Sequence, residues 1–517
     1  MHDPKTNSAT TTPLTLAAVC QAHNALSVSG VEANRSALVA AVAAATGASA
    51  ECVSGWLAGV DVLAEYATQT LDETDALDEE DCAVEVARAA TRPLLEARLQ
   101  RLLDVAKLQR SGPVACLLCE GNAPSQGPRK RSVRSTLGPL AVRRTYCYCA
   151  TCGEGFFPEE TAIKLGSGRY TPRLAESITK LATVLPHKPA TDLCASLLGV
   201  EVSAHASERL IERRSAFVSS VKTREANELR PHDDSGLARQ LKRPADAGAQ
   251  APKTAYFETD GVFVMVREHD EARSTAPPPG ARGGKGRRYE VAGREVKNGI
   301  LYTDDDCAME TPQRGCLLDK TYISHLGTWQ AFATRVWPEM LRMRFDQAET
   351  RVVLSDGAEW IRTFCEWLPF KVLLILDLFH VKKRINEVAL ALYRDDEVGR
   401  RRWRAVQDDR TDGARIDELL AALKEAEPKG ASAKALVDDL HTYITNNRDR
   451  MDYPAYKAQG LRVGSGAVES ANFHVTGNRL KLQGMRWSEI GAADMAVLRT
   501  DLFNGRWRQR TEEMLAA

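Results

Sequence analysis

The sequence predicts a protein of several domains in which helical and cysteine-rich segments precede an α/β core. Three observations support this fold class. Apolar residues recur at helical spacing before residue 110, two Cys-x-x-Cys pairs follow, and short apolar strands alternate with helices after residue 254. At 517 residues the chain is also too long for one ordinary domain, since domains average about 150 residues.

The composition is that of a globular protein without a membrane segment. Lysine and arginine together number 69, as do aspartate and glutamate, and hydrophobic residues make up 44% of the chain. No stretch approaches the roughly 18 apolar residues that a membrane-spanning helix needs. Residues 1–5 provide no basic flank before an apolar run, so we expect no secretory signal and a cytoplasmic or nucleoid location.

Four cysteines have the spacing of a structural zinc site. Cys116 and Cys119 form one Cys-x-x-Cys pair, and Cys149 and Cys152 form the other. Two such pairs can supply four thiolates to one tetrahedral Zn²⁺. Cys147 lies on the same side of its expected strand as Cys149 and is an alternative ligand. A redox pair or a coincidence of spacing would also explain the pattern.

The segment between the cysteine pairs has the features of a basic β-hairpin. A turn is expected at Gly138-Pro139, with alternating residues on either side. Residues 121–153 contain arginines but no acid, and Arg143 and Arg144 lie on the second strand. A basic zinc ribbon is a candidate DNA contact, although solvated surface would explain any single block of charge.

The residues after the ribbon predict helices with helix-turn-helix spacing. A helix over 190–199, a turn, and a helix capped by Ser203 place Arg209 and Arg213 on the second helix, which enters the major groove in such motifs. Any pair of antiparallel helices gives a similar pattern. We expect these divisions: a helical domain 1–110, the zinc ribbon 111–160, the helix-turn-helix-like domain 161–231, a linker 232–253, a first core part 254–385, a helical insertion 386–460, and a second core part 461–517.

Three acids stand where a catalytic site would need them. Asp260 and Asp356 are each expected to close a buried strand, and Glu469 opens a helix. Gathered carboxylates repel one another unless a cation neutralises them, and hard oxygen ligands suit Mg²⁺ or Mn²⁺. Taken singly, each acid has a simpler explanation, because Asp-Gly is a common turn and an acid near a helix start offsets the helix dipole.

Six short motifs lie in order in the second half of the chain: Thr259-Asp-Gly261, Val296-Lys-Asn-Gly-Ile-Leu-Tyr302, Ser355-Asp-Gly-Ala-Glu-Trp-Ile361, Ile375-Leu-Asp-Leu-Phe-His-Val381, Gly464-Ser-Gly-Ala-Val-Glu-Ser470 and Gly484-Met-Arg-Trp-Ser488. Together they resemble the motifs of the ISKra4-type bacterial insertion-sequence transposases. The resemblance covers about residues 256–507 and extends to the segment 149–157. It implies an RNase H-like catalytic core with an Asp-Asp-Glu triad.

Carried onto this sequence, the resemblance implies that Asp260, Asp356 and Glu469 are the three acids and bind two Mg²⁺ or Mn²⁺ ions. Asp377 and His380 resemble the Asp-x-x-His element of related transposases and would support the site. Two alternatives remain at this stage. Asp377 rather than Asp356 is the other candidate metal ligand, and His380 has the competing explanation of an ordinary core histidine.

The activity implied by the resemblance is cleavage at the element's ends followed by transfer of the 3′-hydroxyl into target DNA, by at least a dimer on paired ends. The implied DNA contacts include Arg486 and Trp487, and Trp403 could stack on an unpaired base, although core packing is the more usual role of a tryptophan. The alternatives are an RNase H-like nuclease without strand transfer and a domesticated, non-catalytic DNA-binding protein.

Overall fold

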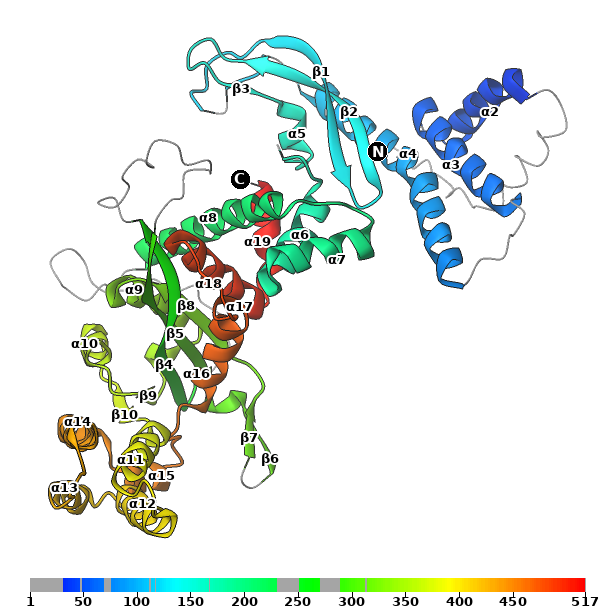
Figure 1. Ribbon diagram of the computed structural model, residues 1–517. Coiled ribbons are helices and arrows are strands. Elements are labelled where there is room, and N and C mark those ends of the chain that lie inside the picture. Colours follow the sequence, from blue (N-terminus) through cyan, green and yellow to red (C-terminus); the bar gives the residue numbers. More distant parts are fainter. Residues whose placement is uncertain are drawn as a thin grey trace, which may run out of the picture. The chain divides into compact units, whose positions relative to one another are not determined.

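The computed structural model describes residues 31–46, 49–68, 76–110, 113–116, 118–166, 168–229, 251–269, 289–311 and 314–516 (Figure 1). Most of the expected linker, residues 232–250, therefore lies outside the described residues. The chain divides into two compact units. The first comprises Met1–Leu181, His187–Ser207 and Thr511–Ala517, and the second comprises Ala182–Pro186 and Glu208–Arg510. Within the described residues, no helix is long and apolar enough to cross a membrane.

The first unit begins with helices, as the sequence predicts. These are α2 (Val31–Thr46), α3 (Ala50–Thr68) and α4 (Ala76–Gln109). Helices α3 and α4 approach closely at Gly59, where an added Cβ would lie 2.0 Å from the carbonyl oxygen of Ala90. Only glycine allows this distance between the two backbones.

The predicted basic hairpin is confirmed, with its turn placed slightly earlier than expected. Strands β1 (Ser125–Ser135) and β2 (Gly138–Tyr148) are antiparallel, and the short β3 (Gly155–Phe156) pairs with β2. Ser135 pairs directly with Gly138, so the turn is at residues 136–137 rather than at Gly138-Pro139. Gly138 has φ +102°, which suits glycine because it has no Cβ.

The helices after the hairpin follow the expected pattern. They are α5 (Pro158–Ala162), α6 (Pro172–Val184), α7 (His187–Leu198) and α8 (Ala204–Glu228). Ser203 caps α8 as predicted, because its Oγ accepts a hydrogen bond from the N–H of Ala206 at 3.2 Å.

The second unit is built on a five-stranded mixed sheet with the strand order β10-β9-β4-β5-β8. Strands β4, β5 and β8 are antiparallel neighbours, whereas β9 and β10 run parallel to β4. A separate hairpin, β6 and β7, precedes β8. The strands are β4 (Thr254–His269), β5 (Tyr289–Thr303), β6 (Cys307–Thr311), β7 (Arg314–Leu317), β8 (Thr321–Leu326), β9 (Thr350–Ser355) and β10 (Leu373–Leu376).

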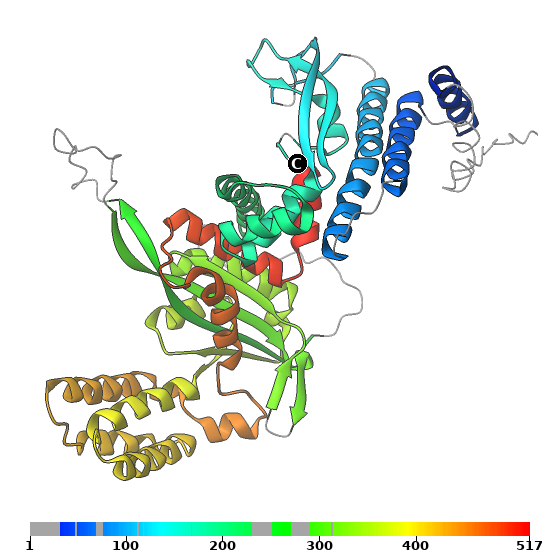
Figure 2. The same ribbon diagram turned by 45° about the vertical axis from the view of Figure 1, so that its right-hand side comes forward.

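Helices cover both faces of this sheet (Figure 2). Tyr256 and Leu354 belong to a core shared with α11 (Leu378–Leu392) and the helical insertion. On the other face, Phe257 and Val353 pack with α9 (Trp329–Arg342) and α10 (Glu359–Trp367). Because strand residues alternate between faces, even-numbered residues of β4 and β9 point toward α11.

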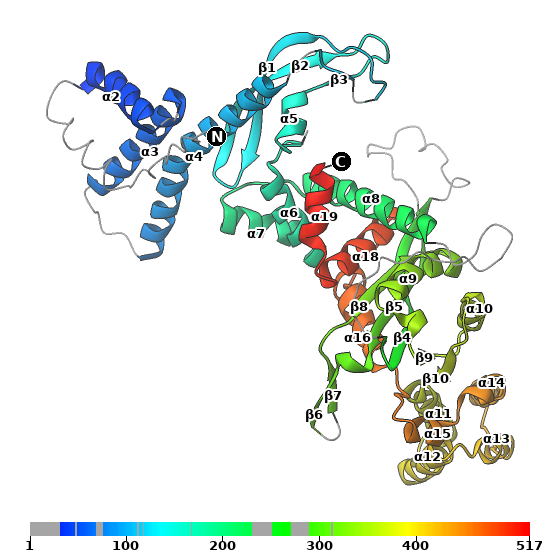
Figure 3. The ribbon, with the colours of Figure 1, turned by 180° about the vertical axis from the view of Figure 1, so that it is seen from behind.

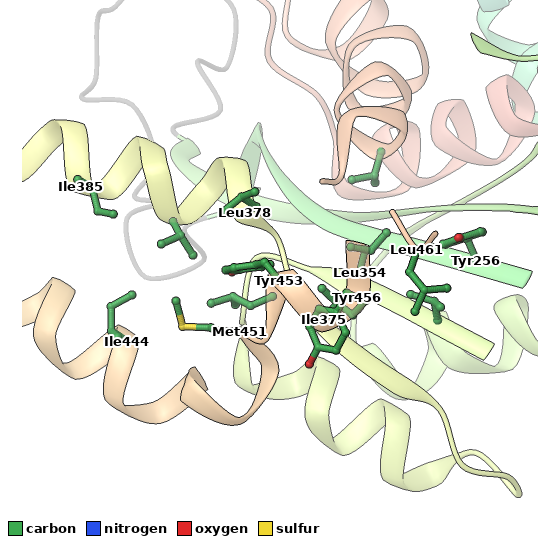
Figure 4. Packing of buried hydrophobic residues seen from close by; sticks show 14 of the residues in the cluster. Tyr256, Leu354, Ile375, Leu378, Ile385, Ile444, Met451, Tyr453, Tyr456 and Leu461 are labelled. Carbon is green, nitrogen blue, oxygen red and sulfur yellow. The ribbon is translucent and has the colours of Figure 1, made fainter. Parts of the chain in front are cut away.

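The predicted helical insertion is confirmed. It consists of the end of α11, α12 (Glu397–Asp412), α13 (Ile416–Lys424), α14 (Ala431–Asn447) and α15 (Tyr453–Ala458). Its apolar side chains continue the core of the sheet: Ile385 and Ile444 lie in the same cluster as Ile375 and Leu354 of the strands (Figure 4). The insertion is therefore packed onto the core rather than attached by a loop alone.

One expectation about the core is wrong. Asp260 does not close a strand, because β4 continues to His269 through an unbroken ladder with β5. The chain after Gly466 is divided into several helical segments, and the N-cap Ser488, whose Oγ accepts from Gly491 N–H at 3.0 Å, starts one of them. The segments are α16 (Gly466–Ala471), the π-helix η5 (Asn472–Gly477), α17 (Asn478–Leu480), α18 (Glu489–Phe503) and α19 (Trp507–Ala516).

Candidate functional site

The register of three parallel strands places three aspartates side by side. Ser355, the last residue of β9, pairs with Thr259 of β4 and with Leu376 of β10. The next residue in each strand direction is Asp260, Asp356 or Asp377. The N–H of Asp377 donates to the carbonyl oxygen of Ser355 at 2.8 Å, which fixes this alignment. The sheet therefore brings the two predicted aspartate ligands and the third candidate side by side, next to the C-terminal ends of β9 and β10.

Asp260 and Asp356 influence each other electrostatically. Asp260 has the strand phase of Tyr256, so it points toward the face that α11 covers. Burial, and then the nearby charge of Asp356, raise the pKa of Asp260. The carboxylate of Asp356 accepts a hydrogen bond from the N–H of Ala358 at 3.0 Å. The two acids thus form a locally negative site at the end of β9.

Asp377 is fully buried and its carboxylate already has partners. It caps α11, where Oδ1 accepts from the N–H of Phe379 at 2.8 Å. Its Oδ2 contacts Nδ1 of His380 at 2.5 Å and accepts a hydrogen bond from Oγ of Ser465. Burial opposes ionisation, but the hydrogen bonds from His380 and Ser465 outweigh it, and the pKa of Asp377 is lowered. Asp377 is therefore an ionised acid that positions its neighbours.

His380 lies among all three aspartates rather than in the apolar core. Its hydrogen bond to Asp377 is the main reason that its pKa is raised, and the charges of Asp260 and Asp356 act in the same direction. The side chain is partly exposed, at 20% of its full accessible area. A protonated imidazole here would be available to an anionic group at the strand ends.

Glu469 lies on α16. Ser465, the N-cap residue of α16, donates a hydrogen bond to Asp377, and the amide of Asn472 at the start of η5 donates to Oδ2 of Asp260 at 2.6 Å. These two contacts attach both ends of the segment to the aspartates, and Glu469 lies between them in the chain. The side chain of Glu469 is exposed.

Asn298 and Asn472 form an amide network beside Asp260. Neither residue was predicted from the sequence to have a role, although Asn298 lies within one of the six motifs. Asn298 Nδ2 donates to Oδ1 of Asn472 at 2.8 Å and to Oγ1 of Thr476 at 2.9 Å. Asn472 and Thr476 lie in the π-helix η5, a distortion that often occurs at functional sites. Asn298, shortly before the apolar run Ile300-Leu301-Tyr302, was the available sequence signal.

A buried acid, Glu258, holds the base of α16 and was also missed. Its carboxylate accepts from Tyr302 Oη at 2.5 Å and from the N–H of Val468 at 2.9 Å. Burial raises the pKa of Glu258 to about 7. Because Val468 directly precedes Glu469, this contact fixes the helix that presents the third acid. An acid in a strand that otherwise reads as apolar could have indicated it.

The three aspartates lie side by side, but their carboxylate oxygens are not grouped as closely as the ligand atoms of a metal ion. Within the described residues, the one group of three or more His, Cys, Asp or Glu ligand atoms that all lie within 4.8 Å of one another is formed by Cys116, Cys119, Cys149 and Cys152. Asp356 nevertheless lies close enough to Asp260 to raise its pKa, and the side chain of Glu469 is exposed to solvent.

The four predicted cysteines do come together. Sγ–Sγ distances are 3.5 Å for Cys116 and Cys152 and 3.5 Å for Cys119 and Cys149. Backbone N–H groups of the turn and the Sγ of Cys119 lower the pKa of Cys149 to about 6 despite the opposing effect of burial. Cys147 is buried in the strand outside this group. Four thiols are the number of donors in a tetrahedral metal site, and sulfur donors suit a thiophilic cation.

The arginines predicted to contact DNA from the hairpin and from α8 differ in whether they are exposed to solvent or bonded within the protein. Arg143, Arg209 and Arg213 are exposed. Arg144 instead bonds Glu160 at 2.6 Å, and its guanidinium lies 3.4 Å from the ring centre of Phe157. Arg144 therefore stabilises the hairpin.

The remaining predicted contacts are in the second unit. Trp403 packs against the core and lies 6.3 Å from the ring of Tyr393, which favours the packing alternative for this residue. Arg486 is exposed. The backbone of Trp487 pairs with β4 beyond the end of β9, through bonds to Met265 and Arg267. Trp487 thus closes the edge of β4 just past the acids.

Comparison with known proteins finds relatives whose function is not described. Residues 327–515 match the model of an uncharacterised protein family, UPF0236. The chain is also 24% identical over 364 residues to the "UPF0236 protein in vanSb 3'region" of Streptococcus gallolyticus, an alignment that covers 68% of each chain. The family match includes Asp356, Asp377, His380 and Glu469, whereas Asp260 precedes it.

Proposed function

We propose that this protein is a DNA transposase that cuts the ends of a mobile element and joins the freed 3′-hydroxyl to target DNA. The observation that carries the proposal is the register of Thr259, Ser355 and Leu376, which aligns three aspartates. The contacts of Ser465 and Asn472 attach the segment that carries Glu469 to two of these aspartates. The sheet order β8-β5-β4-β9-β10, with the last two strands parallel to β4, supports the RNase H-like core that the sequence motifs imply.

Asp260, Asp356 and Glu469 are the proposed ligands of Mg²⁺ or Mn²⁺. The residues fit such ions, because burial and then the charge of Asp356 raise the pKa of Asp260, and a bound cation would favour its ionised form. Asp356 suits the second position better than Asp377, whose two oxygens accept three hydrogen bonds inside the protein. A pair of bound divalent ions would activate the attacking oxygen and stabilise the leaving oxygen.

The chain's own groups would orient the reacting phosphate. In cleavage, a water oxygen attacks phosphorus and the P–O3′ bond breaks, leaving a 3′-hydroxyl. In transfer, the oxygen of that hydroxyl attacks phosphorus of a target phosphodiester, the target P–O3′ bond breaks, and the target strand leaves with a 3′-hydroxyl. His380, held by Asp377, can donate a hydrogen bond to a phosphate oxygen in both steps. Asn472 and Ser465 keep the Glu469 helix against the strand ends.

The cysteine group is the proposed Zn²⁺ site of a ribbon that contacts DNA. The four thiols supply the ligand set of a structural zinc, and the exposed Arg143 on the same hairpin provides positive charge for phosphates. Arg209 and Arg213 on α8 are a further proposed contact. Joining two element ends requires both in one complex, so the active form is proposed to be at least a dimer.

The test is a cleavage and strand-transfer assay on DNA that carries the ends of the element surrounding the gene. Wild type should give joined products in Mg²⁺ and none in EDTA. Glu469→Gln should lose both products, while Glu489→Gln, at the exposed start of α18, should retain them. Cleavage without joining would support a nuclease instead. DNA binding without chemistry in any metal would leave the DNA-binding protein as the explanation.

A further inference from the structure

A pocket lies away from the acids, on the sheet face that α9 and α10 cover. It has a volume of about 400 Å³ and is lined by residues of α8, β8, α9 and α10. Figure 3 labels these four elements. Three of its lining residues are basic: Lys222, His325 and Arg335. None of the described residues that line it is acidic. His325 has the strand phase of Ile323, which packs with α9, so the pocket is separate from the proposed active site.

Two buried donors in this pocket have no acceptor. Nη1 of Arg335 and Nε1 of Trp337 are buried, and neither has a hydrogen-bond partner in the described part of the chain. Both groups donate and cannot accept. Buried donors are normally paired because desolvation without a hydrogen bond is costly. A ligand that brings several acceptor oxygens would satisfy both atoms.

Burial disfavours the positive charges of this pocket, and a bound anion would offset that cost. Burial lowers the pKa of Arg335, and burial together with the charges of Arg335 and Lys297 lowers the pKa of His325 to about 4. Burial likewise lowers the pKa of Lys222, although Glu339 and Asp501 oppose this. The main acid near Lys222 is already shared: Glu339 bonds both terminal nitrogens of Arg506, at 2.5 and 2.7 Å.

We propose that this pocket binds a phosphate group, carried by a free nucleotide or by the DNA backbone. Arg335, Lys222 and Trp337 offer donors from three side chains, which suits the several oxygens of a phosphate better than a planar carboxylate. Trp337 and Trp367, with ring centres 6.4 Å apart, provide an aromatic wall for a base or sugar. The cavity is within the usual size range of small-ligand sites.

The experiment measures phosphate binding to the full chain. Inorganic phosphate, a nucleoside monophosphate and a DNA duplex without element ends are titrated separately, with tryptophan fluorescence and the thermal midpoint as readouts. Arg335→Met and Lys222→Met each remove one basic donor. Arg402→Met, an exposed residue of α12, removes the same charge elsewhere and is the matched control.

Binding should weaken about tenfold or more in Arg335→Met and Lys222→Met but not in Arg402→Met. Saturation by inorganic phosphate and the nucleotide would identify a free-nucleotide site. An effect confined to the duplex would identify a backbone phosphate. If Lys222→Met keeps the wild-type thermal midpoint and binds all three probes as tightly as Arg402→Met does, the proposal is wrong. This outcome is independent of the cleavage assay, because the pocket contains none of the proposed catalytic residues.

Discussion

The side-chain amide of Asn472 donates a hydrogen bond to Oδ2 of Asp260 at 2.6 Å, although 211 residues separate the two in the chain. This contact joins the π-helix η5 to the middle of β4. A matching contact between Ser465 and Asp377 fixes the other end of the same helical segment. Glu469 lies between the two contacts, so its position depends on both.

Asn472→Ala should lower the rate of strand cleavage strongly and the free energy of unfolding only slightly. The substitution removes the amide that holds Asp260 and leaves Asn298 with Thr476 as its remaining partner. We expect the cleavage rate to fall by about tenfold to a hundredfold, since a misplaced catalytic group commonly costs that much. The loss of unfolding free energy should be about 1 kcal/mol. Asn478→Ala, at an exposed position of α17, is the control and should change neither value.

Asp377→Asn should lower the pKa of His380 and destabilise the protein in a pH-dependent way. The raised pKa of His380 means that its stabilising effect is complete below the ordinary value of about 6.5 and is lost as the pH rises through the raised value. The lowered pKa of Asp377 means that its own contribution is lost only as the pH falls through that lowered value.

The cost of Asp377→Asn should therefore be greatest between about pH 4 and pH 6.5, at about 2 kcal/mol, and smaller above pH 8. Urea unfolding at pH 5.5 and pH 8.5 measures it, and histidine resonances in NMR report the His380 titration. A constant cost at both pH values, with an unchanged titration, would show that the pair is not coupled.

Glu258→Gln should remove a loss of stability that wild type suffers as the pH rises. The folded pKa of Glu258, about 7, is above its ordinary value, so the unfolded carboxyl releases its proton first. Wild type then loses about 3 kcal/mol between pH 4.5 and pH 7 at this site. The unfolding free energy of the variant should therefore rise relative to that of wild type between pH 4.5 and pH 7. Urea titrations at pH 5 and pH 8 that give the same difference between the two proteins would contradict this.

Cys149→Ser should abolish zinc binding, whereas Cys147→Ser should preserve it. Cys149 belongs to the four-thiol group and Cys147 does not. Elemental analysis should find about one zinc per chain in wild type and Cys147→Ser, and almost none in Cys149→Ser. Equal zinc loss in both variants would make Cys147 a ligand. A protein without zinc after expression in zinc-supplemented medium would remove the metal from the account.

The local elements could be predicted from the sequence, but the neighbours of the acids could not. The apolar run before Asp356 identified the end of β9, because such runs have strand length and composition. Residues 262–266 are typical of a strand, but the sequence predicted an interruption at Asp260-Gly261, whereas the ladder with β5 runs through these residues without a break. Ser465 and Asn472 were missed because their partners are remote in the chain.

The most direct test of the central claim replaces Mg²⁺ with Fe²⁺ and maps backbone cleavage by locally generated hydroxyl radicals. If Asp260, Asp356 and Glu469 together bind the metal, fragments of the cleaved protein should end near all three residues, although these lie far apart in the sequence. The fragments should disappear with excess Mg²⁺ and in Asp356→Asn, but persist in Asp346→Asn. Cleavage that is absent, or that clusters only at the cysteines, would contradict the proposed metal-dependent active site.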